Sequence, residues 1–184
     1  INEVEKEKEQ TASKDTILHV LPENKQIEYQ FKYIEAVKLR LLGKRSASLE
    51  YLNQCSEIKP QAPDPYYQKS LIANQIEEYG QAIHYGEKAV QYGPNNKWYR
   101  LNLANLYIQE QTLDSARMQY EYLVEKMKIN DLDMVWKLAQ LNQKTNNYQE
   151  ALNYYDEIEG RIGINERISQ LKKRIYAKIG EKEK

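Results

Sequence analysis

A repeated spacing of about 34 residues constrains the fold of this chain more than any other feature of its sequence. Small residues return at steps of 34, 34 and 35 residues, and two further columns keep the same steps. The first column is Ser48, Ala82, Ala116 and Ala151; the second is Ala36, Ser70, Ala104 and Ala139; the third, mostly apolar, is Cys55, Ala89, Leu123 and Ile158. Three columns with one period indicate a structural unit present four times, each unit too small to bury its apolar face without its neighbours.

Each unit is expected to consist of two helices and a short turn. The chain holds seven Gly and five Pro in 184 residues, too few for a turn-rich β fold. The expected helices cover about 24–42, 46–58, 64–79, 81–92, 97–110, 113–128, 132–144, 148–159 and 165–179. Gly43, Gly80 and Gly180 are interpreted as helix ends, since glycine readily takes the left-handed conformation that follows a helix. Two antiparallel helices approach closely where side chains are small, so we expect the two small columns to face each other within each pair. The chain is therefore predicted to be an all-α solenoid.

Composition excludes several classes of partner. The chain has 27 basic and 27 acidic residues, so no global field draws it to a nucleic acid or an anionic membrane. Residues 1–15 carry five acids and three lysines, a net charge of −2, and residues 161–184 carry eight basic residues and three acids, a net charge of +5. We interpret the basic end as a solvated helix rather than a nucleic-acid patch. No stretch approaches the roughly 18 apolar residues that a membrane-spanning helix needs.

The sequence offers no catalytic constellation. Its two histidines, His19 and His84, lie far apart, and the single Cys55 falls in an apolar column where burial is expected. We find no phosphate-binding glycine loop, paired-cysteine motif, HExxH or nucleophile elbow. We therefore predict no enzyme activity, no metal site and no cofactor for this segment.

The repeated pattern resembles the tetratricopeptide repeat (TPR), a 34-residue helix–turn–helix unit. In that register the units are 29–62, 63–96, 97–131 and 132–165, and the two small columns fall at the family's small positions 8 and 20. The unit-ending proline is present as Pro60 and Pro94 and is replaced by Lys128 and Gly163. The resemblance implies a right-handed superhelix of antiparallel helix pairs.

The same register implies a domain plan. Residues 1–24 are expected to form a polar lead and an N-terminal cap, in which Ile17, Leu18, Val20 and Leu21 cover the open end of the array. Residues 25–165 are the four repeats, and residues 166–184 are a partial fifth repeat or a C-terminal capping helix. The runs at 93–99 and 163–176 also resemble exported repeat proteins of the Gram-negative cell envelope, and on that resemblance we expect the envelope or periplasm rather than the cytoplasm.

The resemblance also implies a concave groove, which the first helix of each pair lines at unit positions 2, 5, 6, 9, 12 and 13. Mapped onto this chain, the predicted groove residues are Tyr33, Arg40, Tyr67, Gln68, Asn74, Trp98, Asn102, Asn105, Gln109, Trp136, Lys137, Gln140, Gln143 and Lys144. Aromatic residues supply contact area and amides satisfy an extended peptide backbone. A merely hydrated face is the alternative. The Lys/Arg–Asn clamp that many family members use for a terminal carboxylate is absent, because Tyr33 and Val37 occupy its first-unit positions.

Three hypotheses for function stay open from the sequence. The leading one is a non-catalytic scaffold that binds a protein or peptide in its concave groove. The second is a sensory or regulatory segment at the N-terminal side of a longer enzyme or transcription regulator. The third is a structural spacer or self-assembly module whose open ends stack on one another.

Overall fold

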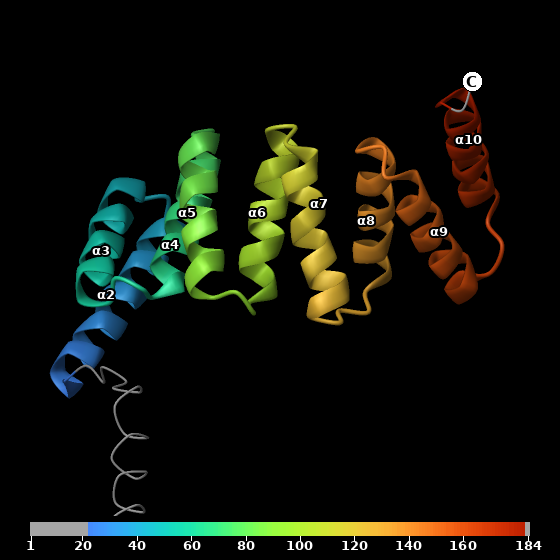
Figure 1. Ribbon diagram of the computed structural model, residues 1–184. Coiled ribbons are helices and arrows are strands. Elements are labelled where there is room, and N and C mark those ends of the chain that lie inside the picture. Colours follow the sequence, from blue (N-terminus) through green and yellow to red (C-terminus); the bar gives the residue numbers. More distant parts are fainter. Residues whose placement is uncertain (1–21, 183–184) are drawn as a thin grey trace, which may run out of the picture.

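The computed structural model describes residues 22–182 as a single row of helices (Figure 1). The helices are α2 (Glu23–Leu41), α3 (Arg45–Ile58), α4 (Pro63–Gln75), α5 (Tyr79–Tyr92), α6 (Lys97–Gln109), α7 (Leu113–Glu121), η1 (Tyr122–Lys126), α8 (Leu132–Lys144), α9 (Tyr148–Ile162) and α10 (Glu166–Lys182). Successive helices pack as the pairs α2–α3, α4–α5, α6–α7 and α8–α9, and α10 follows at the far end of the row. The predicted all-α solenoid is confirmed, whereas the cap expected at residues 17–21 lies outside the described residues.

The core of the row is built on the three repeated columns. All twelve column residues have an exposed fraction of 0%. Two serines in the small columns also hold the pairs together, because their hydroxyls donate to the carbonyl of the facing residue. Ser48 Oγ donates to Ala36 O at 2.7 Å, and Ser70 Oγ donates to Ala82 O at 2.8 Å. The small columns thus face each other within each pair, as the spacing predicts.

The turn inside each pair uses one left-handed residue at the same unit position. These residues are Gly43, Glu77, Gln111 and Asn146, with φ of 74°, 61°, 57° and 61°. Only one of the four is glycine, although a residue with a Cβ pays roughly 1–2 kcal/mol for this conformation. The left-handed conformation therefore depends on the position in the unit, where the packing of the two helices requires it, rather than on the type of residue.

This rule corrects two predicted helix ends. Gly80 does not end α4, which already stops at Gln75; it lies inside α5. Gly180 does not end the last helix either, because α10 continues to Lys182. In the second unit Glu77 makes the turn, so the glycine three residues later is free to be helical.

The third unit contains one extra residue, and a π-helical turn accommodates it. The unit spans 97–131, which is 35 residues, and its second helix changes from α to π at Tyr122–Lys126. There the Met127 N–H donates to the carbonyl of Tyr122 at 2.9 Å, the five-residue step of a π turn. Leu123 at the start of the π turn and Ile158 in the next unit are both fully buried. The third column therefore stays in the core on both sides of the extra residue.

Candidate functional site

At the N-terminal end of the predicted groove, three of its residues bind one another. Gln68, only 7% exposed, accepts from Arg40 Nε at 2.7 Å and donates through Nε2 to the Tyr33 hydroxyl at 3.2 Å. The Tyr33 ring in turn lies parallel to that of Tyr29, with centroids 6.3 Å apart. Burial is the main cause that raises the pKa of Tyr33. This end of the groove is a closed polar network that links α2 to α4.

In the middle of the row the predicted residues divide into engaged and open ones. The ring of Tyr67 packs on that of Tyr99, with centroids 5.0 Å apart. Asn102 Nδ2 donates to Ser70 Oγ at 2.7 Å, which ties α6 to α4. Asn74 is half-buried, whereas Asn105 and Gln109 are exposed. The open amides of this segment are therefore Asn105 and Gln109.

Trp98 lies at the loop edge of the array. Its side chain is 59% exposed, and the Lys97 ammonium lies 4.8 Å from the centroid of its ring. The Asn96 side chain caps the start of α6 by accepting the Trp98 backbone N–H at 2.9 Å. This hydrogen bond holds the backbone of Trp98 in place. Together with the loops before α6 and before α8, Trp98 borders a shallow hollow of about 590 Å³.

At the C-terminal end, Trp136 contacts residues of both following helices. Its ring meets Tyr155 of α9 edge-on, with centroids 5.9 Å apart, and the Arg167 guanidinium of α10 lies 5.2 Å from the Trp136 ring centroid. Tyr155 is fully buried, and its hydroxyl donates to Gln143 Oε1 at 2.9 Å. Burial raises the pKa of Tyr155 to about 12, so the phenol stays neutral and continues to donate at physiological pH.

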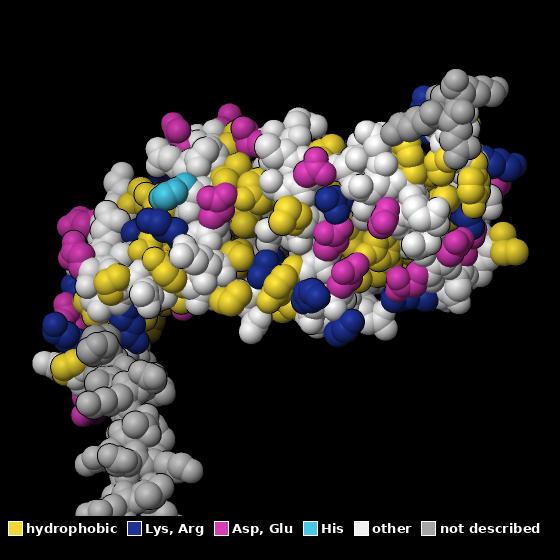
Figure 2. Space-filling view, viewed as in Figure 1, with side chains coloured by type: hydrophobic (Ala, Val, Ile, Leu, Met, Phe, Trp, Pro, Cys, Tyr) yellow, Lys and Arg dark blue, Asp and Glu magenta, His cyan; other side chains and the backbone are white. Residues whose placement is uncertain are grey.

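A pocket with a volume of about 620 Å³ lies between α8, α9 and α10. The large apolar and aromatic residues of its lining are Leu171, Ile175, Tyr148 and Tyr155, of which Ile175 and Tyr155 are fully buried. The pocket is lined by Gln140, Gln143, Lys144, Tyr148, Tyr155, Leu171, Arg174, Ile175, Ala177 and Lys178, a set with three cations and no carboxylate. In the space-filling view, hydrophobic side chains gather at this end of the row (Figure 2). Of the predicted groove residues, Gln140, Gln143 and Lys144 are brought together here, while half-buried Lys137 is not part of the lining.

The residues that α10 adds to this pocket were missing from the predicted groove. Leu171, Arg174, Ala177 and Lys178 stand at positions 6, 9, 12 and 13 of a fifth unit that starts at Glu166. The register that predicts the groove in the first four units includes these four positions, whereas Ile175, which also lines the pocket, stands at position 10 outside it. The signal was present in the sequence, in the alignment of the last helix with the first helix of a repeat.

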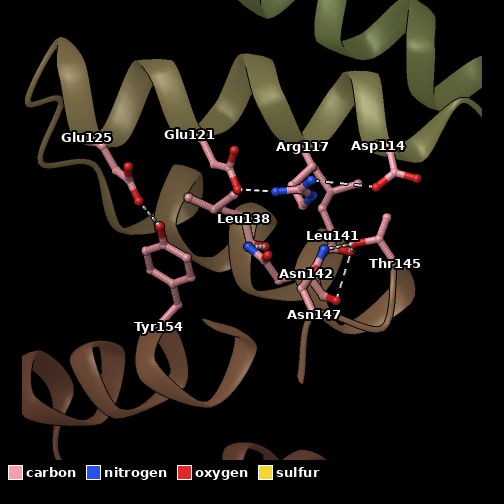
Figure 3. A network of polar contacts seen from close by, with 10 residues as sticks. All are labelled: Asp114, Arg117, Glu121, Glu125, Leu138, Leu141, Asn142, Thr145, Asn147 and Tyr154. Atoms are coloured by element: carbon pink, nitrogen blue, oxygen red, sulfur yellow. Dashed lines mark hydrogen bonds and ion pairs between the residues drawn. The ribbon is translucent and has the colours of Figure 1, made fainter. Parts of the chain in front are cut away.

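A second polar cluster lies where α7, α8 and α9 meet (Figure 3). Arg117 forms ion pairs with Asp114, at 3.6 Å, and with Glu121 on its own helix, while its Nε is buried without a hydrogen-bond partner. Asn142 on α8 is 0% exposed; its Nδ2 donates to Leu138 O at 3.0 Å, and its Oδ1 has no partner. The cluster thus runs from fully buried Asn142 to Asp114, whose side chain is 77% exposed.

Comparison with solved structures identifies the fold. No protein-family model and no curated protein sequence matches the chain. Among solved structures, YrrB, described as a TPR protein with an unusual peptide-binding site, has a TM-score of 0.66 and 17% identity over 81% of this chain and 76% of its own. The chain folds as a tetratricopeptide-repeat array. MamA AMB-1 gives 0.64 at 15% identity over 84% of both chains, and MamA 41-end from Desulfovibrio magneticus RS-1 gives 0.62 at 12% over 83% and 85%.

Two further findings on the TPR array concern the described residues alone. Among residues 22–182, no group of three or more His, Cys, Asp or Glu is placed to hold a metal ion. In the same range, no helix combines the length and the apolar character needed to cross a membrane.

Proposed function

We propose that this repeat array binds an extended protein or peptide segment in its concave groove, and that the pocket between α8 and α10 is the main contact point. The observation that carries the proposal is a pocket lining that combines apolar side chains with the exposed cations Lys144 and Arg174 and holds no carboxylate. An apolar side chain of the ligand enters the 620 Å³ space, and a neighbouring carboxylate is held by the two cations.

The amides of the pocket orient the ligand backbone. Gln143 is held in place by the Tyr155 hydroxyl, at 2.9 Å, which leaves its NH₂ group for a ligand carbonyl. Gln140 lies one turn earlier on α8 and lines the same pocket. A fixed amide loses less conformational entropy on binding than a mobile one, so the hydrogen bond from Tyr155 supports affinity.

A comparison within the array supports this choice of site, and a solved structure supports peptide binding in general. The N-terminal end of the groove is occupied by its own network of Tyr33, Arg40 and Gln68, whose polar atoms a ligand would have to displace. YrrB, which shares the fold, is described as having an unusual peptide-binding site. That description applies to YrrB, and for the present chain it gives a precedent for peptide binding on this architecture.

Selection from a random peptide-display library tests the proposal, because the library samples many candidate ligands at once. We expect enrichment of peptides that carry a large apolar residue next to Asp or Glu. Their affinity should fall by at least about tenfold, the effect of losing interface hot-spot contacts, in the double variant Lys144→Glu/Arg174→Glu. The matched control is Lys25→Glu/Lys126→Glu, which changes two exposed cations elsewhere by the same charge. A library without enrichment, or an equal loss in both double variants, would refute the site.

A further inference from the structure

Lys69 on α4 is a charged residue in a core position. Its side chain is only 5% exposed, and the same unit position holds the buried residues Leu103 and Leu138 in the third and fourth units. The packing of the array therefore does not require a charge at this position. A buried ammonium is costly unless a partner compensates the water that it loses. The surroundings of Lys69 thus indicate what kind of partner its charge requires.

The groups in contact with the Lys69 ammonium are neutral. It donates to Ser56 Oγ of α3 at 2.9 Å, and it lies 5.3 Å and 5.8 Å from the ring centroids of Tyr66 and Tyr85. Ser56 and both tyrosines are half-buried, so the ammonium lies close to the surface. Among the described residues no carboxylate forms an ion pair with Lys69, and exposed Glu57 acts on it from a greater distance.

A second ammonium adds to the positive charge at the same place. Lys88 of α5 also lies 5.3 Å from the Tyr66 ring centroid, and the ion pairs of the described residues do not include it. After burial, the charge of Lys88 is the main cause that lowers the pKa of Lys69, so the two cations act on each other. His84, one turn earlier on α5, is exposed, and Figure 2 shows lysine or arginine side chains at the surface beside its cyan ring. We call Lys69 and Lys88 the lysine pair.

The lysine pair occurs in the second unit alone. The residues at the two corresponding positions are Glu35 and Gln54 in the first unit, Leu103 and Tyr122 in the third, and Leu138 and Glu157 in the fourth. None of these other pairs combines two cations. The accumulated positive charge is therefore a property of this place in the chain and not of the repeated architecture.

We propose that the lysine pair binds a phosphate-type oxyanion at the junction of α3, α4 and α5. Two ammonium groups attract a doubly charged ligand more strongly than a singly charged one, and a phosphate group carries about −1.5 to −2 charges at pH 7. Ser56 uses one of the three N–H groups of Lys69, and the others are left for charge-assisted hydrogen bonds to phosphate oxygens. Lys69 stands at unit position 7, outside the predicted groove, so this site is separate from the peptide pocket.

Calorimetric titration of the whole chain with inorganic phosphate, at neutral pH and constant ionic strength, tests the site. The affinity should fall by at least about tenfold in Lys88→Gln, because a hydrogen bond to a charged group is lost. Lys69→Met should abolish binding. The matched control is Lys126→Gln, which removes an exposed cation from η1 and should bind phosphate as the wild type does. Circular dichroism checks the fold of each variant. Absence of binding to the wild type, or unchanged affinity in Lys88→Gln, overturns the proposal.

Nuclear magnetic resonance of chains with ¹³C-labelled lysine locates the ion independently. The Cε signals of Lys69 and Lys88 are assigned through the two variants. They should shift over the same phosphate concentrations that release heat, while the signal of Lys126 stays in place. Equal shifts of all three lysines would show general screening of charge and would overturn the proposal.

Two further ligands test the charge and the source of the anion. Acetate, with a single charge, should bind at least about tenfold more weakly than phosphate, and equal affinity overturns the assignment to a phosphate-type ion. O-phosphoserine that binds more tightly than inorganic phosphate identifies a phosphorylated side chain as the source, and weaker binding identifies the free ion. The double variant Lys144→Glu/Arg174→Glu should leave phosphate binding unchanged, so this site and the peptide pocket can each fail without the other.

Discussion

Replacement of Asn142 by leucine should stabilise the array. Asn142 is completely buried on α8, and its Oδ1 has no hydrogen-bond partner (Figure 3). Its unit position holds Leu39, Ala73 and Tyr107 in the other three repeats, so the site is built for an apolar side chain. Leucine has the same heavy-atom connectivity as asparagine, with two methyl groups in place of the amide oxygen and nitrogen, and its larger volume adds a packing cost.

The size of the gain follows from two opposing contributions. A buried acceptor without a partner costs about 1–3 kcal/mol, and leucine removes that cost. The bond from Asn142 Nδ2 to Leu138 O, 3.0 Å long, is lost, which costs about 0.5–1.5 kcal/mol. The Leu138 carbonyl still accepts its helical N–H, so this loss falls at the low end. We expect a net stabilisation of about 1–2 kcal/mol, or about 2–8 °C in melting temperature for a chain of this length.

Urea unfolding followed by circular dichroism measures the effect. The midpoint should rise in Asn142→Leu while the m-value stays constant, which shows that the native surface is unchanged. Asn142→Ala is the matched comparison, because it also removes the acceptor but leaves a cavity, and it should gain less or lose stability. A midpoint below that of the wild type in Asn142→Leu would contradict the reasoning. It would mean that overpacking by the larger side chain outweighs the removal of the unpaired acceptor.

Three further substitutions test the packing of the array. Gly93→Ala should cost about 1–3 kcal/mol in urea unfolding, because its Cβ would lie 2.8 Å from the Tyr99 ring, while Gly80→Ala, with nothing within 4 Å, should not destabilise. Ala116→Leu should cost at least about 1–3 kcal/mol, since this fully buried residue stands where two helices cross; wild-type stability would refute the close approach. Lys69→Met should raise stability at neutral pH, because burial, and then the charge of Lys88, lowers the pKa of Lys69 and the folded state carries the charged form at a cost. That advantage over wild type should shrink as the pH rises toward the unfolded-state pKa of about 10.4, and an advantage independent of pH would contradict it.

The repeated columns predicted the core well, because burial depends on periodicity, which is visible in one sequence. All twelve column residues are fully buried, and the pairing of Ser48 with Ala36 was expected from their spacing. The turn of the second unit was predicted wrongly. Glycine only lowers the energy of a left-handed residue by roughly 1–2 kcal/mol, and helix packing imposed that conformation on Glu77 instead.

The candidate groove was located by register, but register does not tell which polar atoms are free. Asn102 and Asn105 were both predicted as ligands for a peptide backbone. Asn102 is bonded to Ser70 on the neighbouring helix, so its replacement by alanine should lower stability, whereas exposed Asn105 remains available for a ligand. Contacts between repeats depend on the distance between neighbouring helices, and that distance cannot be read from the spacing of residues along the chain.

The π turn at Tyr122–Lys126 confines the structural effect of the one extra residue in the third unit to a short segment. In an array where every unit docks on the previous one, one added residue inside a helix would rotate all that follows by about 100° and turn the inner surface outward. Here the wider turn takes up that rotation within five residues, so the units after it stay in phase with those before. The segment that follows Leu123 is thus where a single-residue deletion should be tolerated, and the same deletion within α8 or α9 should break the continuity of the inner surface.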